Sequence, residues 1–190
     1  MGKSAAAGIL TQLGIPVVDT DLVARSLVEP GSTALQEIVE RFGSEILDPA
    51  GALNRGLLAK IVFQDPSKRL VLEGILHPRI AQVWRDAVQQ WKRSSSSGAV
   101  VIPLLFEKQY EREFDAVVSV ACTQATQQGR LKERGWNLQQ IQDRIAAQLP
   151  VPEKINRSPF VVWTEGTLHS HRLQWEFILN RLGSPVSSED

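Results

Sequence analysis

The chain has 190 residues, 43% of them hydrophobic, which is enough for one domain with its own core. Its 21 Lys and Arg residues balance its 21 Asp and Glu residues, so no overall charge favours nucleic acid or an acidic membrane as the partner. One cysteine, Cys122, excludes an internal disulfide and a zinc site built from several cysteines. Without an apolar run of about 20 residues or a secretion-signal pattern, we expect a cytoplasmic protein.

The start of the chain predicts a helix, a strand and a second helix. Ala5–Leu13 follows a helical pattern, and Gly14 is placed to end that helix. The next apolar residues, Pro16–Val18, fit a short buried strand that ends at Asp19. A second helix is predicted over roughly Asp21–Val28, because a Pro-Gly pair breaks the pattern beyond it.

The middle of the chain predicts a series of helices. Thr33 can cap one helix, and the Asp-Pro-Ala-Gly sequence at residues 48–51 is typical of a turn. Pro66 fits the first turn of another helix, with Asp65 as its cap, and Pro78 is placed to open the next. From there to Trp91, apolar residues recur at three- and four-residue steps, which indicates a buried helix face.

Short apolar runs in the second half of the chain predict strands at residues 99–102, 116–121 and 160–163. The stretch from Gln124 to Leu149 is helical in pattern, and an amphipathic helix is predicted over His169–Leu182. Strands that alternate with helices favour an α/β fold with a parallel sheet. We predict one domain over residues 1–183 and a polar tail over residues 184–190.

Gly2, Lys3 and Ser4 stand directly before the first predicted helix. The sequence Gly-Lys-Ser ends a P-loop, in which backbone N–H groups and a helix N-terminus hold phosphates. The lysine of such a loop neutralises the β- and γ-phosphates, and the hydroxyl binds magnesium. Three residues can also match by chance, so the interpretation depends on their order with the motifs that follow.

Two carboxylates, Asp19 and Asp21, follow the first predicted strand. The carboxyl ends of parallel strands line the ligand crevice of open α/β sheets. One carboxylate there can accept the proton of an attacking hydroxyl, and one can hold magnesium through water. Which of the two is the base stays open, as does the alternative that Asp21 only caps the second helix.

Two further segments are candidates for binding a substrate. His77 precedes the helix expected at Pro78, whose dipole would disfavour protonation of the imidazole, and its alternative role is to cap that helix. The apolar loop Pro103–Glu107 follows a predicted strand, so it can line an acceptor pocket or simply cover the sheet.

Arg130 and Arg134 are four residues apart, so they share one face of the helix expected there. Two guanidinium groups on one face can clamp a triphosphate and can be brought in by a closing lid. The alternative is a solvated helix surface.

In this order and spacing, these segments resemble the dephospho-CoA kinase family from residue 2 to about residue 150. The segments that carry the resemblance are Gly2–Ser4 (GKS), Val17–Arg25 (VVDTDLVAR), Leu72–Ile80 (LEGILHPRI), Ile102–Glu107 (IPLLFE), Gln127 with Arg130 and Arg134, and Arg144–Gln148 (RIAAQ). The resemblance implies a P-loop kinase fold: a parallel sheet flanked by helices, a helical acceptor-binding region and a lid. It also implies phosphoryl transfer from ATP, with Mg2+, to the 3′-hydroxyl of the dephospho-CoA ribose, the last step of coenzyme A synthesis.

The resemblance also implies roles for individual residues. Asp21 would match the family's catalytic aspartate, with Lys3 and Arg134 assisting, and Ser4 and Asp19 would hold the magnesium ion. The ATP site would comprise Gly2, Lys3, Ser4, Ala5, Arg130 and Arg134, and the dephospho-CoA site would comprise Asp19, Asp21, Arg25, His77, Pro103, Leu104, Leu105 and Glu107. The small-molecule substrate would be the partner, with no nucleic acid and no membrane, and we expect a monomer.

The chain departs from the family pattern near both ends. The family's loop reads GGIGxGKS after a strand, whereas only Met1 stands before Gly2, so we expect the natural protein to continue upstream with such a strand and loop. Ala5 replaces the usual threonine. Ser158–Thr164 replaces the family's Ala-Asp pair and its later asparagine, so no adenine contact is carried over for that segment.

Two other functions fit the same residues. Another small-molecule P-loop kinase, acting on a nucleoside monophosphate or on shikimate, would use the same phosphate site. A non-catalytic relative would keep a pocket for a CoA-like ligand without the ATP chemistry.

Overall fold

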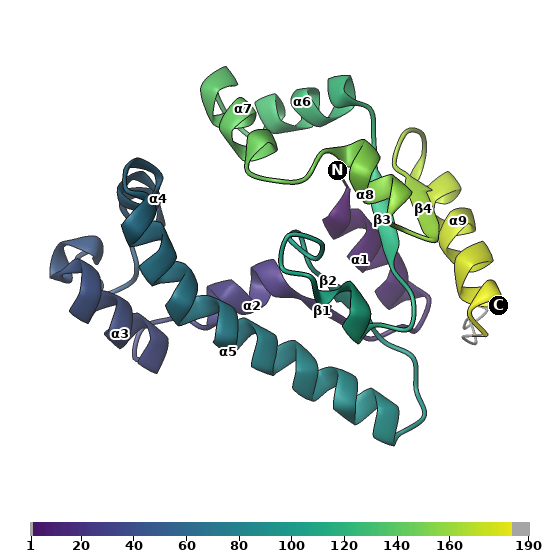
Figure 1. The fold of residues 1–190 in the computed structure, drawn as a ribbon, viewed down its shortest axis with the longest axis horizontal. Coiled ribbons are helices and arrows are strands. Elements are labelled where there is room, and N and C mark those ends of the chain that lie inside the picture. The colour runs from purple at the N-terminus through teal and green to yellow at the C-terminus, as the bar shows by residue number, and fades with distance from the viewer. Residues whose placement is uncertain (1, 184–190) are drawn as a thin grey trace. The chain divides into compact units, whose positions relative to one another are not determined.

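The computed structural model describes residues 2–183, which form an α/β fold of two compact units (Figure 1). The first unit combines residues 2–17 with residues 101–183, and the second unit is Val18–Val100. The polar tail predicted over residues 184–190 lies outside the described residues, as does Met1. The single domain expected over residues 1–183 stays a prediction.

In the first unit, two strands pair in parallel and helices cover them. Strands β3 (Val118–Ala121) and β4 (Phe160–Trp163) are aligned with Val118 opposite Phe160 and Ala121 opposite Trp163. The helices are α1 (Lys3–Gln12), α6 (Gln124–Glu133), α7 (Leu138–Ala146), α8 (Val151–Asn156) and α9 (Leu168–Arg181), and a 3-10 turn spans Tyr110–Glu113. Helix α9 packs against α1 and β4, and α8 packs against β3, so the predicted combination of parallel strands and helices is confirmed.

Helix α1 ends where the sequence predicts. Gly14 adopts the left-handed conformation, with φ of 79°, which a residue with a side chain rarely takes. Its N–H donates to the carbonyl of Thr11 at 3.0 Å, and the N–H of Ile15 donates to that of Leu10 at 2.9 Å. These two bonds form a Schellman motif, which satisfies carbonyls that the end of the helix leaves open.

The second unit is mainly helical. Strands β1 (Val17–Asp19) and β2 (Ala99–Val101), where the chain enters and leaves this unit, form a two-stranded sheet. The helices are α2 (Thr20–Ser26), α3 (Thr33–Phe42), α4 (Arg55–Gln64) and α5 (Pro66–Arg93), with a 3-10 turn at Ser44–Ile46. Helices α2, α3 and α4 all pack against α5, around a core of Val28, Ala34, Ile38, Phe42, Ile46, Leu58 and Ile75.

Helix α5 corrects the prediction that Pro78 opens a new helix. Pro78 lies inside one continuous helix of 28 residues, which Figure 1 shows as an unbroken ribbon. A proline inside a helix costs about 3 kcal/mol, because it removes one hydrogen bond and crowds the preceding turn. Ile75 and Trp84 are buried on either side of it, and burying such side chains contributes about 1.5–3 kcal/mol each, which outweighs that cost.

Other differences concern caps and short helices. Ser32, not Thr33, caps α3, since its hydroxyl accepts the N–H of Leu35 at 3.3 Å. The cap expected before Pro66 is confirmed, because Asp65 accepts the N–H groups of Ser67 and Lys68. Helices α4 and α8 were not predicted.

Within residues 2–183, no helix combines the length and the apolar character needed to cross a bilayer.

Candidate active site

The start of α1 has the form of a phosphate-binding helix N-terminus. Gly2 is the N-cap residue, with φ of 82° and ψ of 11°, and no side chain caps the helix. A Cβ atom at this position would lie 2.8 Å from Cγ2 of Thr164, so both the backbone conformation and the packing require glycine. The first N–H groups of a helix have no partner inside it and carry partial positive charge, which suits an anion. Lys3 is half-buried beside this end, and Ser4 is exposed.

Thr164 links the start of α1 to Arg130. Thr164 is buried, and both its N–H and its hydroxyl donate to the carbonyl of Ala121, at 2.8 Å and 3.1 Å. Arg130 donates from Nη1 to the Thr164 hydroxyl at 2.8 Å and from Nη2 to the Thr164 carbonyl at 2.6 Å. The structure therefore brings Arg130 and Gly2 against the same threonine. The expected contact of Arg130 with ATP stays a prediction.

Helix α6 is anchored at its beginning, whereas Arg134 lies exposed at its end. The carboxylate of Glu165 accepts the N–H of Thr123 at 2.6 Å and the hydroxyl of Thr126 at 2.9 Å. These hydrogen bonds lower the pKa of Glu165 below its ordinary value. Arg134 is the C-cap residue of α6 and is solvent-exposed, so its guanidinium group is accessible to a ligand.

In the second unit, Asp19 rather than Asp21 caps α2. Asp19 Oδ1 accepts the N–H of Asp21 at 2.8 Å, and the Asp21 side chain is exposed in the first turn of the helix. The alternative that Asp21 serves as the cap is therefore wrong. Arg25 is exposed in the last turn of α2, and its carbonyl accepts a hydrogen bond from Arg55 Nη2 at 3.2 Å. The roles predicted for these side chains stay predictions.

His77 lies in the interior of α5, so the expectation that it precedes a helix N-terminus is wrong. Its Nδ1 is 3.8 Å from Oε2 of Glu73, one turn earlier on the same helix. The helix-dipole argument therefore does not apply to this imidazole, because dipole effects are confined to the first and last turns. Its predicted contact with dephospho-CoA stays a prediction.

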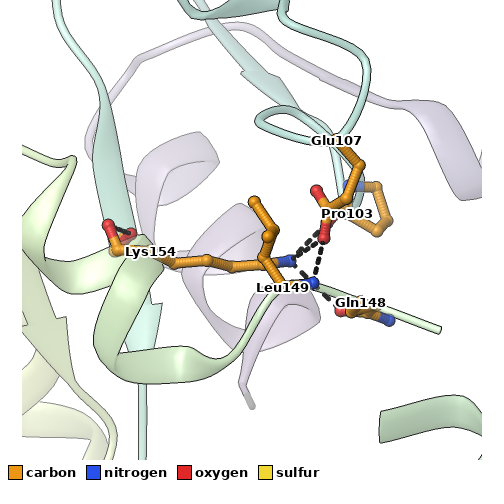
Figure 2. Close-up of polar contacts among 6 residues, drawn as sticks. Pro103, Glu107, Gln148, Leu149 and Lys154 are labelled. Carbon is orange, nitrogen blue, oxygen red and sulfur yellow. Dashed lines mark hydrogen bonds and ion pairs between the residues drawn. The ribbon is translucent and has the colours of Figure 1, made fainter. Parts of the chain in front are cut away.

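The predicted acceptor loop, Pro103–Glu107, is held by a lysine that the sequence did not single out. Figure 2 shows Lys154 Nζ pointing into this loop, 2.8 Å from Glu107 Oε1 and 3.1 Å from the Pro103 carbonyl, with Gln148 Oε1 at 3.3 Å. The N–H of Leu149 donates to the same Glu107 oxygen at 2.8 Å. Burial alone would raise the pKa of Glu107, but the hydrogen bonds from Lys154 and Leu149 outweigh it and hold that pKa below its usual value.

No group of three or more His, Cys, Asp or Glu side chains that could hold a metal ion occurs within residues 2–183. Magnesium in kinase sites typically binds one or two protein oxygens together with substrate phosphates and water. Ser4 lies in the first unit and Asp19 in the second, and the magnesium role expected for them stays a prediction.

Comparisons with known proteins agree on one family. The model of the dephospho-CoA kinase family matches residues 1–170. The dephospho-CoA kinase of Gloeobacter violaceus is 40% identical over 181 residues, which cover 95% of this chain and 87% of that protein. The dephospho-CoA kinase of Oryza sativa subsp. japonica is 35% identical over 188 residues, covering 98% of this chain and 82% of that protein.

Solved structures give the same result for the fold. The protein TT1252 from Thermus thermophilus superposes with a TM-score of 0.77 at 28% identity, covering 95% of this chain and 92% of the other. Dephospho-CoA kinase from Campylobacter jejuni superposes with a TM-score of 0.69, covering 95% of this chain and 91% of the other. The two sequences are 20% identical, so this likeness supports the fold alone. With the family match over residues 1–170 and relatives at 35–40% identity along nearly the whole sequence, the chain belongs to the dephospho-CoA kinase family.

Proposed function

We propose that this chain transfers the γ-phosphoryl group of ATP to the 3′-hydroxyl of the ribose of dephospho-CoA, the reaction that completes coenzyme A. Membership of the dephospho-CoA kinase family supports this reaction. The observation that supports ATP binding is the uncapped start of α1, where Gly2 takes a left-handed conformation directly before Lys3 and Ser4.

On the ATP side, positioning and charge neutralisation account for the chemistry. The N–H groups of Gly2 to Ala5 and the Lys3 ammonium group would hold the phosphates, since a helix N-terminus favours negative charge. Arg134, and Arg130 in addition to its contact with Thr164, would approach the phosphates from α6. Ser4 and Asp19 would hold a magnesium ion, whose charge offsets that of the phosphoryl group in transfer.

On the acceptor side, a carboxylate must take the proton of the attacking hydroxyl. Asp21 is exposed and does not cap its helix, which leaves its carboxylate available as that base. Arg25, His77 and the loop Pro103–Glu107, including Leu104 and Leu105, would contact dephospho-CoA. We also propose that the protein acts in the cytoplasm as a monomer, without a nucleic-acid or membrane partner.

A panel of acceptors tests the substrate. The purified chain is incubated with ATP and magnesium and with dephospho-CoA, nucleoside monophosphates or shikimate, and the products are followed by mass spectrometry. We expect coenzyme A as the product, and we expect calorimetry to show binding of both ATP and dephospho-CoA. Phosphorylation of a nucleoside monophosphate but not of dephospho-CoA would contradict the proposal. Binding of dephospho-CoA without binding of ATP would identify a non-catalytic relative.

Arg134→Ala is expected to weaken ATP binding at least tenfold and to leave the Kd for dephospho-CoA within about twofold of wild type. A charge-assisted hydrogen bond to phosphate is worth roughly 1.5–3 kcal/mol, which corresponds to a tenfold or larger change. Calorimetric titration with each ligand measures both constants. Lys132→Ala, which removes another exposed cation from the same helix, is the control and is expected to change neither. An equal loss for both ligands in the Arg134 variant would indicate a folding defect instead.

A further inference from the structure

Lys154 is among the few charged side chains that are buried in the described part of the chain, with 8% of its surface exposed. An ammonium group has three N–H donors, and Nζ has three acceptors within reach: Glu107 Oε1, the Pro103 carbonyl and Gln148 Oε1. The first two belong to the acceptor loop, Pro103–Glu107, and lie about fifty residues earlier in the sequence. The side chain therefore joins two distant segments of the first unit.

The backbone of Lys154 is fixed from the opposite side. Its carbonyl accepts hydrogen bonds from the hydroxyls of Ser119 on β3, at 3.1 Å, and Ser158, at 2.8 Å. The two hydroxyls are 2.6 Å apart, and α8 packs against β3. Lys154 thus connects strand β3, through its carbonyl, to the acceptor loop, through its ammonium group.

Arg157, at the end of α8, also contacts the acceptor loop. The guanidinium group of Arg157, the C-cap residue of α8, lies 4.5 Å from the ring centroid of Phe106, which is itself buried. Arg157 also forms an ion pair with Glu111 in the following 3-10 turn. The loop is therefore held at Phe106 as well as at its two ends.

The segment just after α7 contacts both Lys154 and Glu107. Gln148 and Leu149 lie just after α7. The side-chain oxygen of Gln148 accepts a hydrogen bond from Lys154, and the N–H of Leu149 donates to Glu107. The chain that leaves α7 is therefore attached both to the acceptor loop and to the lysine that holds it.

We propose that Lys154 is a positioning residue that holds the acceptor loop Pro103–Glu107 in the conformation that binds dephospho-CoA. This inference rests on the function proposed above. The lysine itself does not touch the substrate and acts through Glu107 and Pro103. A buried ion pair is weak evidence for stability, since a well-packed apolar pair is often as stable. The three acceptors of the Lys154 ammonium group, two of them in the loop, are instead explained by the geometry that the lysine imposes on the loop.

The test compares Lys154→Met with two other variants. We expect Lys154→Met to raise the Kd for dephospho-CoA about tenfold or more, since a displaced binding loop can cost up to a hundredfold, and to leave the Kd for ATP within about twofold. Lys154→Arg keeps the charge in a larger, planar group and is expected to give a smaller rise, confined to dephospho-CoA. The control, Arg172→Met, removes an ion pair with the same 2.8 Å distance on α9 and is expected to change neither constant.

Hydrogen exchange supplies a readout that a general loss of stability would not reproduce. The amides of Lys108 and Tyr110 donate to the carbonyls of Leu104 and Leu105, both at 3.0 Å, and so report on the loop. In Lys154→Met these amides are expected to exchange about tenfold faster, while the amides of α9 keep the wild-type rate. Uniformly faster exchange across the first unit, or equal losses of affinity for both ligands, would overturn the proposal.

Two further results need their own interpretation: a Lys154→Met variant that does not fold, and a wild-type chain that does not bind dephospho-CoA. If Lys154→Met does not fold, Lys154→Arg decides: a rise of about threefold or more for dephospho-CoA alone supports the proposal, whereas no change or an equal change for both ligands overturns it. If the wild-type chain does not bind dephospho-CoA, the proposed function is wrong. The exchange of the loop amides then still decides whether Lys154 holds the loop.

Discussion

Asp21→Asn is expected to lower kcat by about a hundredfold or more while leaving the free energy of unfolding nearly unchanged. Loss of a general base typically costs a factor of that size, because an amide cannot accept the proton of the attacking hydroxyl. Asparagine has nearly the same shape as aspartate, and the Asp21 side chain is exposed, so little packing is lost. Initial rates at saturating ATP and dephospho-CoA, together with urea unfolding, measure both effects.

Asp19→Asn is the matched control for this prediction. Asp19 caps α2 by accepting the N–H of Asp21, and asparagine is about as good an N-cap as aspartate, so α2 should keep its stability. A smaller loss of kcat is expected than for Asp21→Asn. Should Asp21→Asn keep kcat within about threefold of wild type, too small a change for the loss of a base, Asp19 would take over that role.

The elements governed by local sequence were predicted well. Gly14 ends α1 because a left-handed residue is needed there, and Asp65 caps α5 because its short carboxylate reaches the next N–H groups. In each case the determining interactions lie within a few residues, where sequence patterns carry the information.

Features that depend on distant contacts were missed or predicted wrongly. Pro78 is locally typical of a helix start, but buried side chains before and after it, Ile75 and Trp84, keep α5 continuous. Nothing in the sequence near Lys154 indicates that it meets Glu107, 47 residues earlier, and the same holds for Arg130 and Thr164, which are 34 residues apart. The individual roles of the site residues came from motif resemblance, which does not supply the partners that position them.

Lys3→Met is expected to reduce turnover by on the order of a hundredfold to a thousandfold, the usual cost of removing one preorganised group that stabilises developing charge. Methionine keeps most of the length and the apolar stem of lysine, so the half-buried position beside the Gly2 cap stays filled. The lost ammonium group is the one expected to neutralise the β- and γ-phosphates. Turnover and the Kd for ATP are therefore expected to worsen together, while the Kd for dephospho-CoA stays within about twofold of wild type.

The control for this prediction is Lys60→Met, which removes an exposed lysine from α4 in the second unit. It lowers the net charge of the chain by the same amount, so it corrects for any general effect of charge on the binding of an anionic nucleotide. We expect it to leave both constants and the turnover unchanged. If Lys3→Met binds ATP as tightly as wild type and keeps its turnover, the start of α1 is not the phosphate site. The ATP half of the proposed mechanism would then have to be built on Arg130 and Arg134 alone.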